Sequence, residues 1–376
     1  MQNERAAHVI GLFPELLGIG GVQEASRLTA AAMVALAPLR NWKLDLLSLN
    51  DSRGPHKLGV GGQSIDFRSF GRSKGRFALA AMLSALSSPT GARQVVVATH
   101  PNLAPVTRLM RWGSSRMRRV VMSHGIEVWE PLPGGRRRAL CKSDVVLGPS
   151  SYTVKKLVEV QNVEQRKAHR LPWPISPWFL RMADAPRCTP PPGFPAGTVI
   201  LTVGRWVVSE QYKGTDDLIR AVAQLKAEFP TVKLVAVGSG DDLPRLRKLA
   251  ADSGLADRVK FFENLSREEL AGCYAHASIF ALPSAGEGFG LVFLEAMAFS
   301  KPIIAAASGG ATDVAEHDVN GLVVPPHDPD QLSQALKRLL QDSSLCERLG
   351  RRGAELVREK YRFEVFQSQL ADIIEA

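Results

Sequence analysis

The residues from position 278 to position 298 carry the strongest signal in this chain, and they read SIFALPSAGEGFGLVFLEAMA. The first five of them are mostly apolar, which predicts a buried strand, and the residues from Leu291 onward favour a helix. The loop between strand and helix contains Gly286, Gly288 and Gly290. Glycine lets a backbone approach a ligand closely, and free N–H groups at a helix start favour phosphate. This order therefore predicts an α/β unit with a ligand at its loop.

The same alternation of apolar runs and amphipathic stretches recurs along the whole chain. It predicts strands at residues 9–13, 44–49, 94–98, 119–122, 145–147, 198–203, 232–237, 259–262, 278–282 and 302–305. The clearest predicted helices are residues 22–37, 215–228, 242–252, 329–340, 344–360 and 364–374. Strands that alternate with helices indicate parallel sheets covered on both faces.

A proline-rich segment separates two such patterns. Residues 171–197 contain eight prolines, and proline neither continues a helix nor donates to a sheet. The chain has 376 residues, which is long for a single core. We predict an N-terminal domain, a linker, a C-terminal domain and a last helix, at residues 1–175, 176–197, 198–360 and 361–376. The expected fold class is α/β, with two Rossmann-like, doubly wound domains that face a central cleft.

Composition excludes several classes of protein. Hydrophobic residues make up 45% of the chain and charged residues 22%, as in ordinary globular proteins. No run approaches the ~18–20 apolar residues that span a bilayer, and the apolar stretch at residues 9–13 is too short for a secretion signal. The four cysteines are widely separated and form no Cys-x-x-Cys pair, which argues against zinc and a disulfide framework. We expect a cytoplasmic protein that binds no metal.

Positive charge is concentrated in the first half of the chain. Residues 1–180 contain 25 Lys and Arg against 11 Asp and Glu, and the remainder contains 22 against 26. Basic clusters lie at residues 68–76, at residues 108–119 with Trp112 and Met117, and at residues 136–138. Such clusters are either solvated faces or a patch that contacts an anionic membrane. Nucleic acid is not expected as a partner, because no recognition motif accompanies the charge.

Two acidic and two basic side chains follow predicted strands of the second half. Glu287 lies on the glycine loop and Glu295 lies in the first turns of the following helix, so both carboxylates can face one cleft and bind a ribose diol. A glutamate at a helix start is also favoured by the helix dipole alone. Arg205 and Lys213 follow the strand at 198–203, where they would neutralise a diphosphate leaving group or simply be solvated.

Three further candidates rest on weaker signals. Gly238 lies in a strand-to-helix turn, and Asn264, after the next strand, would line a base pocket. Gly21 belongs to a glycine loop after the first strand, which would face phosphates or serve only as a tight turn. A dinucleotide fingerprint is not expected, because Gln23 stands where its third glycine belongs.

Two histidines follow predicted strands of the first half. His124 lies beside Gly125 after the strand at 119–122, and His100 precedes Pro101 after the strand at 94–98. At a carboxyl strand end, His124 would bond a sugar hydroxyl through its side chain or stabilise positive charge at the anomeric carbon through its backbone carbonyl. His100 would line the acceptor side. A purely structural role is the alternative for each, since a lone histidine is more often structural than catalytic.

Together these motifs resemble the GT-B-fold retaining glycosyltransferases of family 4. The resemblance covers nearly the whole chain and rests on Gly20-Gly21, His124-Gly125, Gly204-Arg205, Lys213-Gly214, the segment from Glu287 to Glu295, Pro302-Ile303-Ile304-Ala305, and the segments Gly309-Gly310 and Asn320–Pro325. The glutamate segment is highly specific, and the N-terminal motifs are much less so.

The resemblance implies retaining transfer from a nucleotide diphosphate-sugar without a metal or other cofactor. It implies that Arg205 and Lys213 bind the diphosphate, that Glu295 binds the ribose, and that Gly21 lies beside the phosphates. Glu287 and the backbone of Phe289, Gly290 and Leu291 would hold the donor sugar, and His124 would lie near the reacting carbon. The last helix would cross back onto the first domain.

The chain departs from the family pattern at three places. The loop at residues 206–212, which includes Glu210, is longer than usual, which leaves the joint geometry of Arg205 and Lys213 open. Ser300 replaces a glycine, and Thr312-Asp313 stands where Pro-Glu is frequent. None of these changes removes a predicted ligand.

The function expected from these observations is transfer of a hexose from a UDP- or GDP-sugar to a hydroxyl of a saccharide or lipid-linked acceptor, in polysaccharide or glycolipid assembly. The protein would work in the cytoplasm or at the inner face of the plasma membrane. One alternative is a sugar-nucleotide epimerase of the same fold, which would need an acid/base group at a sugar carbon. A non-catalytic sugar-nucleotide or membrane-binding module is the other.

Overall fold

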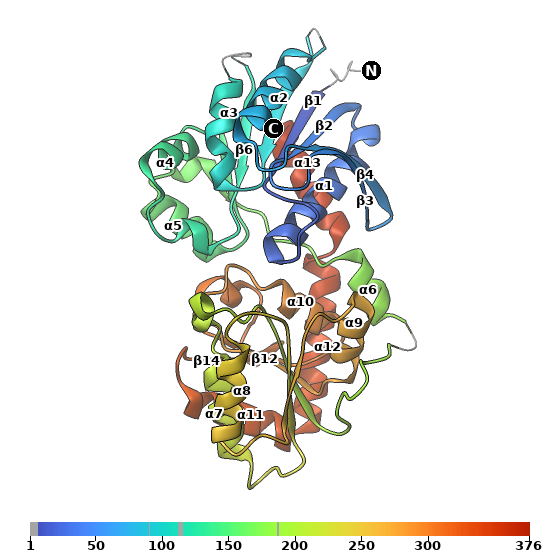
Figure 1. Ribbon diagram of the computed structural model, residues 1–376, viewed down its shortest axis with the longest axis vertical. Helices are drawn as coiled ribbons and strands as arrows, with labels where there is room; N and C mark the ends of the chain where they lie inside the picture. The colour runs from blue at the N-terminus through green and yellow to red at the C-terminus, as the bar shows by residue number, and fades with distance from the viewer. Residues whose placement is uncertain (1–6, 90, 112–115, 186–187) are drawn as a thin grey trace. The chain divides into compact units, whose positions relative to one another are not determined.

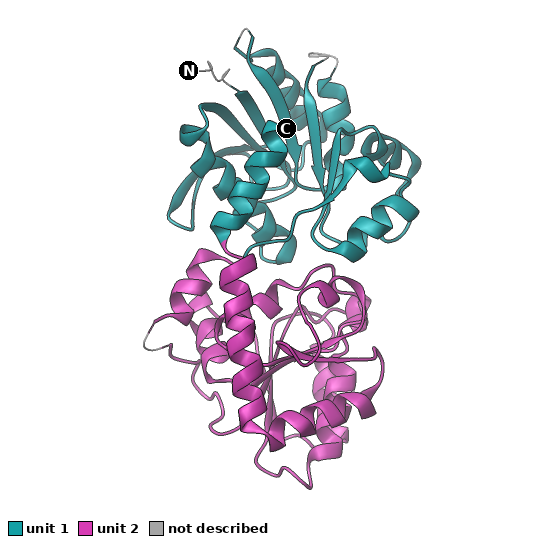
Figure 2. Cartoon of the chain, turned by 180° about the vertical axis from the view of Figure 1, so that it is seen from behind, with its two compact units in different colours: residues 1–174, 363–376 teal, residues 175–362 magenta. Residues whose placement is uncertain are grey.

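The computed structural model describes residues 7–89, 91–111, 116–185 and 188–376, so Trp112 and one of the eight prolines, Pro186, lie outside the described residues. The chain divides into two compact units (Figure 2). Unit 1 comprises Met1–Pro174 and Phe363–Ala376, and unit 2 comprises Ile175–Arg362. Unit 2 thus includes the segment predicted as a linker.

Unit 1 is built on an eight-stranded sheet with the order β3-β4-β2-β1-β5-β6-β7-β8 (Figure 1). Its strands are β1 (Ala7–Phe13), β2 (Trp42–Ser48), β3 (Gly54–Val60), β4 (Gln63–Ser69), β5 (Arg93–Ala98), β6 (Arg118–Met122), β7 (Val145–Gly148) and β8 (Ala168–Arg170). Among the described residues, neighbouring strands of this sheet run parallel except in the β3–β4 hairpin. The central strands are buried on both faces, as parallel strands covered by helices are.

The helices of unit 1 are α1 (Gly21–Leu39), α2 (Lys74–Leu86), α3 (Ala104–Met110), α4 (Gly134–Cys141), α5 (Ser151–Glu159) and α13 (Phe363–Glu375). The terminal helix α13 packs against α1. The Phe366 ring lies 5.9 Å from the Trp173 ring, and the Glu375 carboxylate lies 3.3 Å from Arg40 Nη1. Both ends of α13 are therefore fixed to unit 1.

Unit 2 contains a parallel six-stranded sheet with the order β11-β10-β9-β12-β13-β14. Its strands are β9 (Val199–Val203), β10 (Lys233–Val237), β11 (Val259–Phe262), β12 (Ile279–Leu282), β13 (Ile303–Ala306) and β14 (Gly321–Val324). Its helices are α6 (Pro177–Ala183), α7 (Thr215–Leu225), α8 (Leu243–Asp252), α9 (Arg267–His276), α10 (Leu291–Ala298), α11 (Pro329–Gln341) and α12 (Ser343–Lys360).

The predicted fold class is confirmed: both units are α/β with Rossmann-like sheets. The segment expected to be a linker contains α6, which packs against α9 and α10. The β3–β4 hairpin, β8 and β14 were not predicted. Within the described part of the chain, no helix combines the length and the apolar character needed to cross a membrane.

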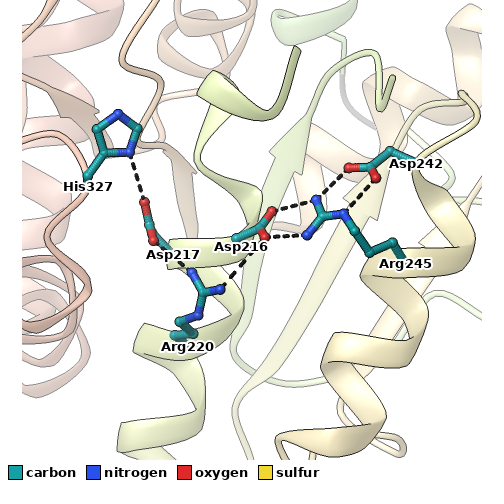
Figure 3. A network of polar contacts seen from close by, with 6 residues as sticks. All are labelled: Asp216, Asp217, Arg220, Asp242, Arg245 and His327. Atoms are coloured by element: carbon teal, nitrogen blue, oxygen red, sulfur yellow. Dashed lines mark hydrogen bonds and ion pairs between the residues drawn. The ribbon is translucent and has the colours of Figure 1, made fainter. Parts of the chain in front are cut away.

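A network of ion pairs joins the first turns of α7 and α8 (Figure 3). Arg245 on α8 donates to Asp216 at 2.9 Å and to Asp242 at 2.7 Å. Asp242 is only 4% exposed, so the Arg245 guanidinium replaces the water contacts that its carboxylate lacks. Arg220 pairs with Asp217 at 3.1 Å on the outside of the network. Hydrogen bonds to Asp216 and Asp242 raise the pKa of Arg245 above its usual value.

We expect Arg245→Ala to lower the free energy of unfolding of the protein by about 1–3 kcal/mol, because it leaves the buried Asp242 carboxylate without its partner. The matched control, Arg220→Ala, removes an exposed arginine of the same network and should cost about 0–1 kcal/mol. Urea denaturation of the full-length variants measures both values. Equal losses would contradict the assignment of Arg245 as the central group.

Candidate active site

Four charged side chains gather beyond the carboxyl ends of β9 and β12 in unit 2. Arg205 follows β9, Lys213 ends the 3₁₀ segment η4 (Val208–Lys213), and Glu287 lies in the loop after β12. The Lys213 Nζ atom is 3.8 Å from Glu287 Oε2 and 3.9 Å from Glu210 Oε2. Glu210 also pairs with Arg205. Glu210 thus joins Arg205 to Lys213, and Lys213 in turn contacts Glu287. The sequence did not predict the contacts of Glu210.

Backbone contacts between the two loops bring these side chains together. The Ala285 N–H donates to the Tyr212 carbonyl oxygen at 2.7 Å. Gly214 has a φ of 72°, and a Cβ atom there would lie 2.3 Å from the Pro283 carbonyl oxygen. Only glycine fits both the conformation and the space. The loop after β9 can therefore lie against the loop after β12, with Lys213 beside Glu287.

Lys213 is held in a partly dehydrated position. Its side chain is 16% exposed and that of Glu287 is 19% exposed, whereas Arg205 is 68% exposed. The Lys213 Nζ atom lies 5.7 Å from the centre of the Tyr212 ring. Burial, together with the Glu287 carboxylate, raises the pKa of the Tyr212 hydroxyl. Charge interactions strengthen as water is removed, and Lys213 is the less exposed of the two cations.

The glycine loop after β12 is held by hydrogen bonds from the loop after β13. The Gly310 N–H donates to the Glu287 carbonyl oxygen at 2.6 Å, and the Ser308 hydroxyl donates to the Ala285 carbonyl oxygen at 2.6 Å. These bonds leave the Glu287 side chain to face Lys213. The backbone of the loop is therefore ordered before any ligand arrives.

Phe289, Gly290 and Leu291 lead from the glycine loop into α10. Phe289 is 3% exposed and its ring lies 5.9 Å from the Tyr361 ring, so its side chain belongs to the interior. Gly290 has a φ of 93° and precedes Leu291, the first residue of α10. Phe289 and Gly290 therefore have no exposed side chain to offer a ligand. The backbone role expected for them stays a prediction.

Glu295 lies one turn into α10 and has a different partner from Glu287. The hydroxyl of Tyr274 donates to Glu295 Oε2 at 2.7 Å. Burial, and then the Glu295 carboxylate, raises the pKa of Tyr274 well above its usual value. The tyrosine therefore stays a hydrogen-bond donor and orients the carboxylate. The sequence contained no signal for this pair, because the two residues come from different helices.

Gly238 and Asn264 follow β10 and β11. Gly238 has a φ of 148°, and a Cβ atom there would lie 1.8 Å from the Gly204 carbonyl oxygen, so it lets two loops approach. Asn264 is exposed, with a φ of 55°. Because β11 is the edge strand, Asn264 follows a strand three positions away from β12, roughly 14 Å along the sheet.

His124 lies at the carboxyl end of β6 in unit 1. Its Nε2 lies 2.6 Å from the Thr99 carbonyl oxygen, which can only accept, so Nε2 carries the proton. Its ring stacks on the Trp173 ring at 5.2 Å, and its backbone N–H donates to Glu127 at 2.6 Å. Burial lowers the pKa of His124 to about 4. The ring is neutral at pH 7, with Nδ1 as an acceptor.

His100 lies at the end of the neighbouring strand, β5, with its ring 5.8 Å from that of His124. Its Nδ1 accepts from the Asn102 N–H at 3.1 Å, so Nε2 is the donor in the neutral ring. Burial, together with His124 and Arg136, lowers the pKa of His100 to about 4. The two predicted histidines are thus adjacent and offer one acceptor and one donor.

Gly21 is the first residue of α1, and a Cβ atom on it would meet nothing within 4 Å. The loop before it is held from two sides. Arg27 donates to the Gly18 carbonyl oxygen at 2.7 Å, and the buried carboxylate of Asp51 accepts from the Leu16 N–H at 2.8 Å. No sequence pattern predicted the contact of Asp51 with Leu16 or that of Trp173 with His124, because the partners lie far apart in the sequence.

Among the described residues, no group of three or more His, Cys, Asp or Glu side chains is arranged to hold a metal ion.

Comparison with known proteins identifies the family. The model of the family described as Glycosyl transferases group 1 matches residues 194–356. The chain is 34% identical to a GDP-mannose-dependent alpha-(1-6)-phosphatidylinositol monomannoside mannosyltransferase of Mycobacterium tuberculosis, over 72% of each chain. It is also 35% identical to a D-inositol 3-phosphate glycosyltransferase of Acidothermus cellulolyticus, over 56% of this chain and 49% of that protein.

Solved structures show the same fold. A sucrose-phosphate synthase of Thermosynechococcus elongatus has a TM-score of 0.77 with 23% identity, over 98% of both chains. An Anabaena protein in complex with UDP and glucose has a TM-score of 0.74 with 17% identity, over 98% of this chain and 99% of that one. From the family match and the mannosyltransferase relative, we conclude that the chain belongs to the glycosyl transferases group 1 family and is a glycosyltransferase.

Proposed function

We propose that this glycosyltransferase moves mannose from GDP-mannose to a hydroxyl of an inositol-containing glycolipid, with retention of configuration and without a metal. We choose this donor and this acceptor because one relative is a GDP-mannose-dependent phosphatidylinositol monomannoside mannosyltransferase. The observation that carries the proposal is the cluster of Arg205, Lys213 and Glu287 at the carboxyl end of the unit 2 sheet.

The two cations would bind the donor diphosphate. Lys213 is a partly buried ammonium and Arg205 an exposed guanidinium, so both can contact phosphate oxygens. Charge develops on the diphosphate as the bond to the sugar breaks. Fixed cations that meet this charge stabilise the transition state, typically by a few kcal/mol per contact. A metal ion is then not needed to neutralise the leaving group.

The remaining donor contacts are assigned from the same loops. We propose that Glu287 and the backbone of Phe289, Gly290 and Leu291 hold the sugar. Glu295, oriented by the Tyr274 hydroxyl, would accept from the ribose hydroxyls. Gly238 and Asn264 would line the base, and Gly21 would lie beside the phosphates.

The histidines would serve the reacting sugar and the acceptor. His124 has its proton on Nε2, where Thr99 accepts it, so Nδ1 can accept from a sugar hydroxyl. His100 would line the acceptor side through its Nε2–H. The acceptor hydroxyl then attacks the anomeric carbon from the face that the diphosphate leaves and passes its proton to the departing phosphate oxygen, so the configuration is retained. The alternative function, a sugar-nucleotide epimerase, has no support among the named relatives, which are transferases.

We further propose that unit 1 binds an anionic membrane that carries the acceptor. Leu79, Leu83 and Leu86 form a stripe on α2, with exposed fractions of 58%, 57% and 61%. They are spaced four and three residues apart, so they share one helix face. Lys74 and Arg76 begin the same helix and are exposed. Apolar side chains beside cations are typical of helices that lie at a membrane surface.

A basic hollow beside α3 supports the same proposal. It has a volume of about 640 Å³ and is lined by Arg108, Arg111, Arg119, Cys141, Lys142, Asp144, Glu164 and Lys167. Its two carboxylates are already paired, Asp144 with Arg119 and Glu164 with Lys167. The other cations face an anion-attracting space, and α3 packs against α2. The leucine stripe of α2 and the basic hollow would therefore act together: the leucines would insert into the membrane, and the cations would attract headgroup phosphates.

Substitution of Lys213 tests the donor site. GDP should raise the melting temperature of the wild-type protein more than UDP or ADP does, because bound ligand stabilises the folded state. Lys213→Ala should abolish the GDP shift and lower mannose transfer from GDP-mannose by about 100-fold or more. The control, Lys248→Ala, removes an exposed lysine of α8 and should leave both unchanged. Normal turnover by folded Lys213→Ala would refute the assignment.

The neutral state of His124 predicts a pH dependence of stability. A folded-state pKa of about 4 lies below the usual value of about 6.5, so the unfolded chain binds the proton more readily. The free energy of unfolding should therefore fall as the pH drops from about 6.5 to 4, with a slope of up to about 1.4 kcal/mol per pH unit for each such histidine. Urea denaturation at several pH values measures the slope.

The slope of the free energy of unfolding against pH should become shallower in His124→Asn. The control, His169→Asn, replaces an exposed histidine of unit 1 and should keep the wild-type slope. A wild-type slope in the His124 variant would show that this ring takes up its proton equally in both states.

The leucine stripe is tested by vesicle binding. The double variant Leu79→Ser, Leu83→Ser should bind vesicles that contain anionic phospholipid about tenfold more weakly or worse, because it loses apolar area that would insert. Its melting temperature should stay close to wild type, since both side chains are exposed. Val208→Ser, which changes an exposed apolar residue of unit 2, is the control. Unchanged binding of the double variant would contradict the proposal.

A further inference from the structure

The longer loop between Arg205 and Lys213 contains a carboxylate that contacts both cations. Glu210 accepts a hydrogen bond from the Arg205 guanidinium through Oε1, and its Oε2 lies 3.9 Å from the Lys213 Nζ atom. The Glu210 side chain is 13% exposed. Each of its two oxygens thus faces one of the two cations, as two oxygens of a bound phosphate group would.

We propose that Glu210 is an internal counter-ion which occupies the diphosphate position between Arg205 and Lys213, and that the donor must displace its carboxylate in order to bind. This inference rests on the proposed role of the two cations in donor binding. It adds a competing group that belongs to the chain itself, and it predicts that the wild-type protein binds its donor more weakly than the two cations alone would allow.

The charges around Lys213 give the first reason to expect that a carboxylate is displaced when the donor binds. Two carboxylates, Glu210 and Glu287, lie within 4 Å of this one ammonium. A diphosphate that arrived without displacing either would place further negative charge beside both. Like charges at such distances repel strongly where water is scarce. One of the two carboxylates must therefore move away when the diphosphate binds.

The way the two carboxylates are held decides which one moves. Glu287 lies on a loop whose backbone is fixed by Gly310, and the neighbouring Ala285 is bonded on both its N–H and its carbonyl sides. Glu210 lies inside η4 with φ −120° and ψ 29°, outside the helical region, so the 3₁₀ segment is kinked at this residue. Its carboxylate can therefore swing away without unwinding a regular helix.

Backbone hydrogen bonds on both sides of Glu210 keep this movement local. The Val208 N–H donates to the Asp241 carboxylate at 2.9 Å, and the Ala285 N–H donates to Tyr212 at 2.7 Å. The segment is thus attached on both sides of Glu210. Release of the carboxylate would expose the two cations while the cations themselves stay in place.

Removal of the Glu210 charge should therefore tighten binding of a nucleoside diphosphate. We expect Glu210→Gln to lower the Kd for GDP about three- to tenfold at low salt, as expected for loss of a partly exposed ion pair. The gain should shrink at high salt, because screening weakens the competing pair. Guanosine, which lacks phosphate, should bind both proteins equally. Isothermal titration calorimetry with GDP, UDP and guanosine measures these affinities.

A matched control separates the position of the charge from its number. Glu228→Gln changes the net charge by the same amount, but Glu228 follows the far end of α7 and pairs with Lys337 at 2.8 Å. It should bind GDP as the wild type does. Glu210→Ser serves as a second variant if the Gln variant is poorly folded, and it should also bind GDP more tightly.

Each outcome decides the inference. Tighter GDP binding by the Glu210 variants alone supports a displaced counter-ion. Unchanged or weaker binding by folded Glu210 variants overturns it and assigns Glu210 to positioning the cations, while the proposed donor site stands. If wild-type protein binds neither GDP nor UDP, the proposed donor site fails and this inference fails with it.

Discussion

The backbone contact between the loops after β9 and β12 underlies the arrangement of the whole donor region. These strands are neighbours in the sheet, so their carboxyl ends meet at one edge. Gly214 then allows the first loop to lie against Pro283 of the second, at a distance that any side chain would prevent. A cation from one loop and a carboxylate from the other become partners as a result. Without this approach, Glu287 would be separated from Lys213 and from the Arg205 that Glu210 links to it.

The two glutamates of the glycine segment illustrate how similar groups acquire different environments. Glu287 faces a lysine, and Glu295 faces the hydroxyl of a fully buried tyrosine. A lysine partner attracts a further anion once a carboxylate yields, whereas a tyrosine partner holds a carboxylate in place by donating a hydrogen bond. The different roles that the family resemblance implies for the two glutamates stay predictions.

Much of the fold followed from the sequence, because parallel strands buried on both faces leave continuous apolar runs. The runs at β9 and β12 are examples. The β3–β4 hairpin was missed although its alternating pattern and the Gly61-Gly62 turn were available. The placement of site residues at strand ends was also predictable. Their partners were not: Glu210, Tyr274 and Trp173 act through side-chain contacts that no spacing rule encodes.

The division of the chain has a consequence for its biosynthesis. Unit 2 is one continuous stretch, whereas unit 1 is completed by the last helix, α13, which follows unit 2 in the sequence. A ribosome therefore delivers every residue of unit 2 before it releases the segment that covers α1. Until α13 has been synthesised, the surface of α1 that α13 later covers stays open to solvent or to a chaperone. Maturation of unit 1 thus waits for a helix that is made after the whole of unit 2.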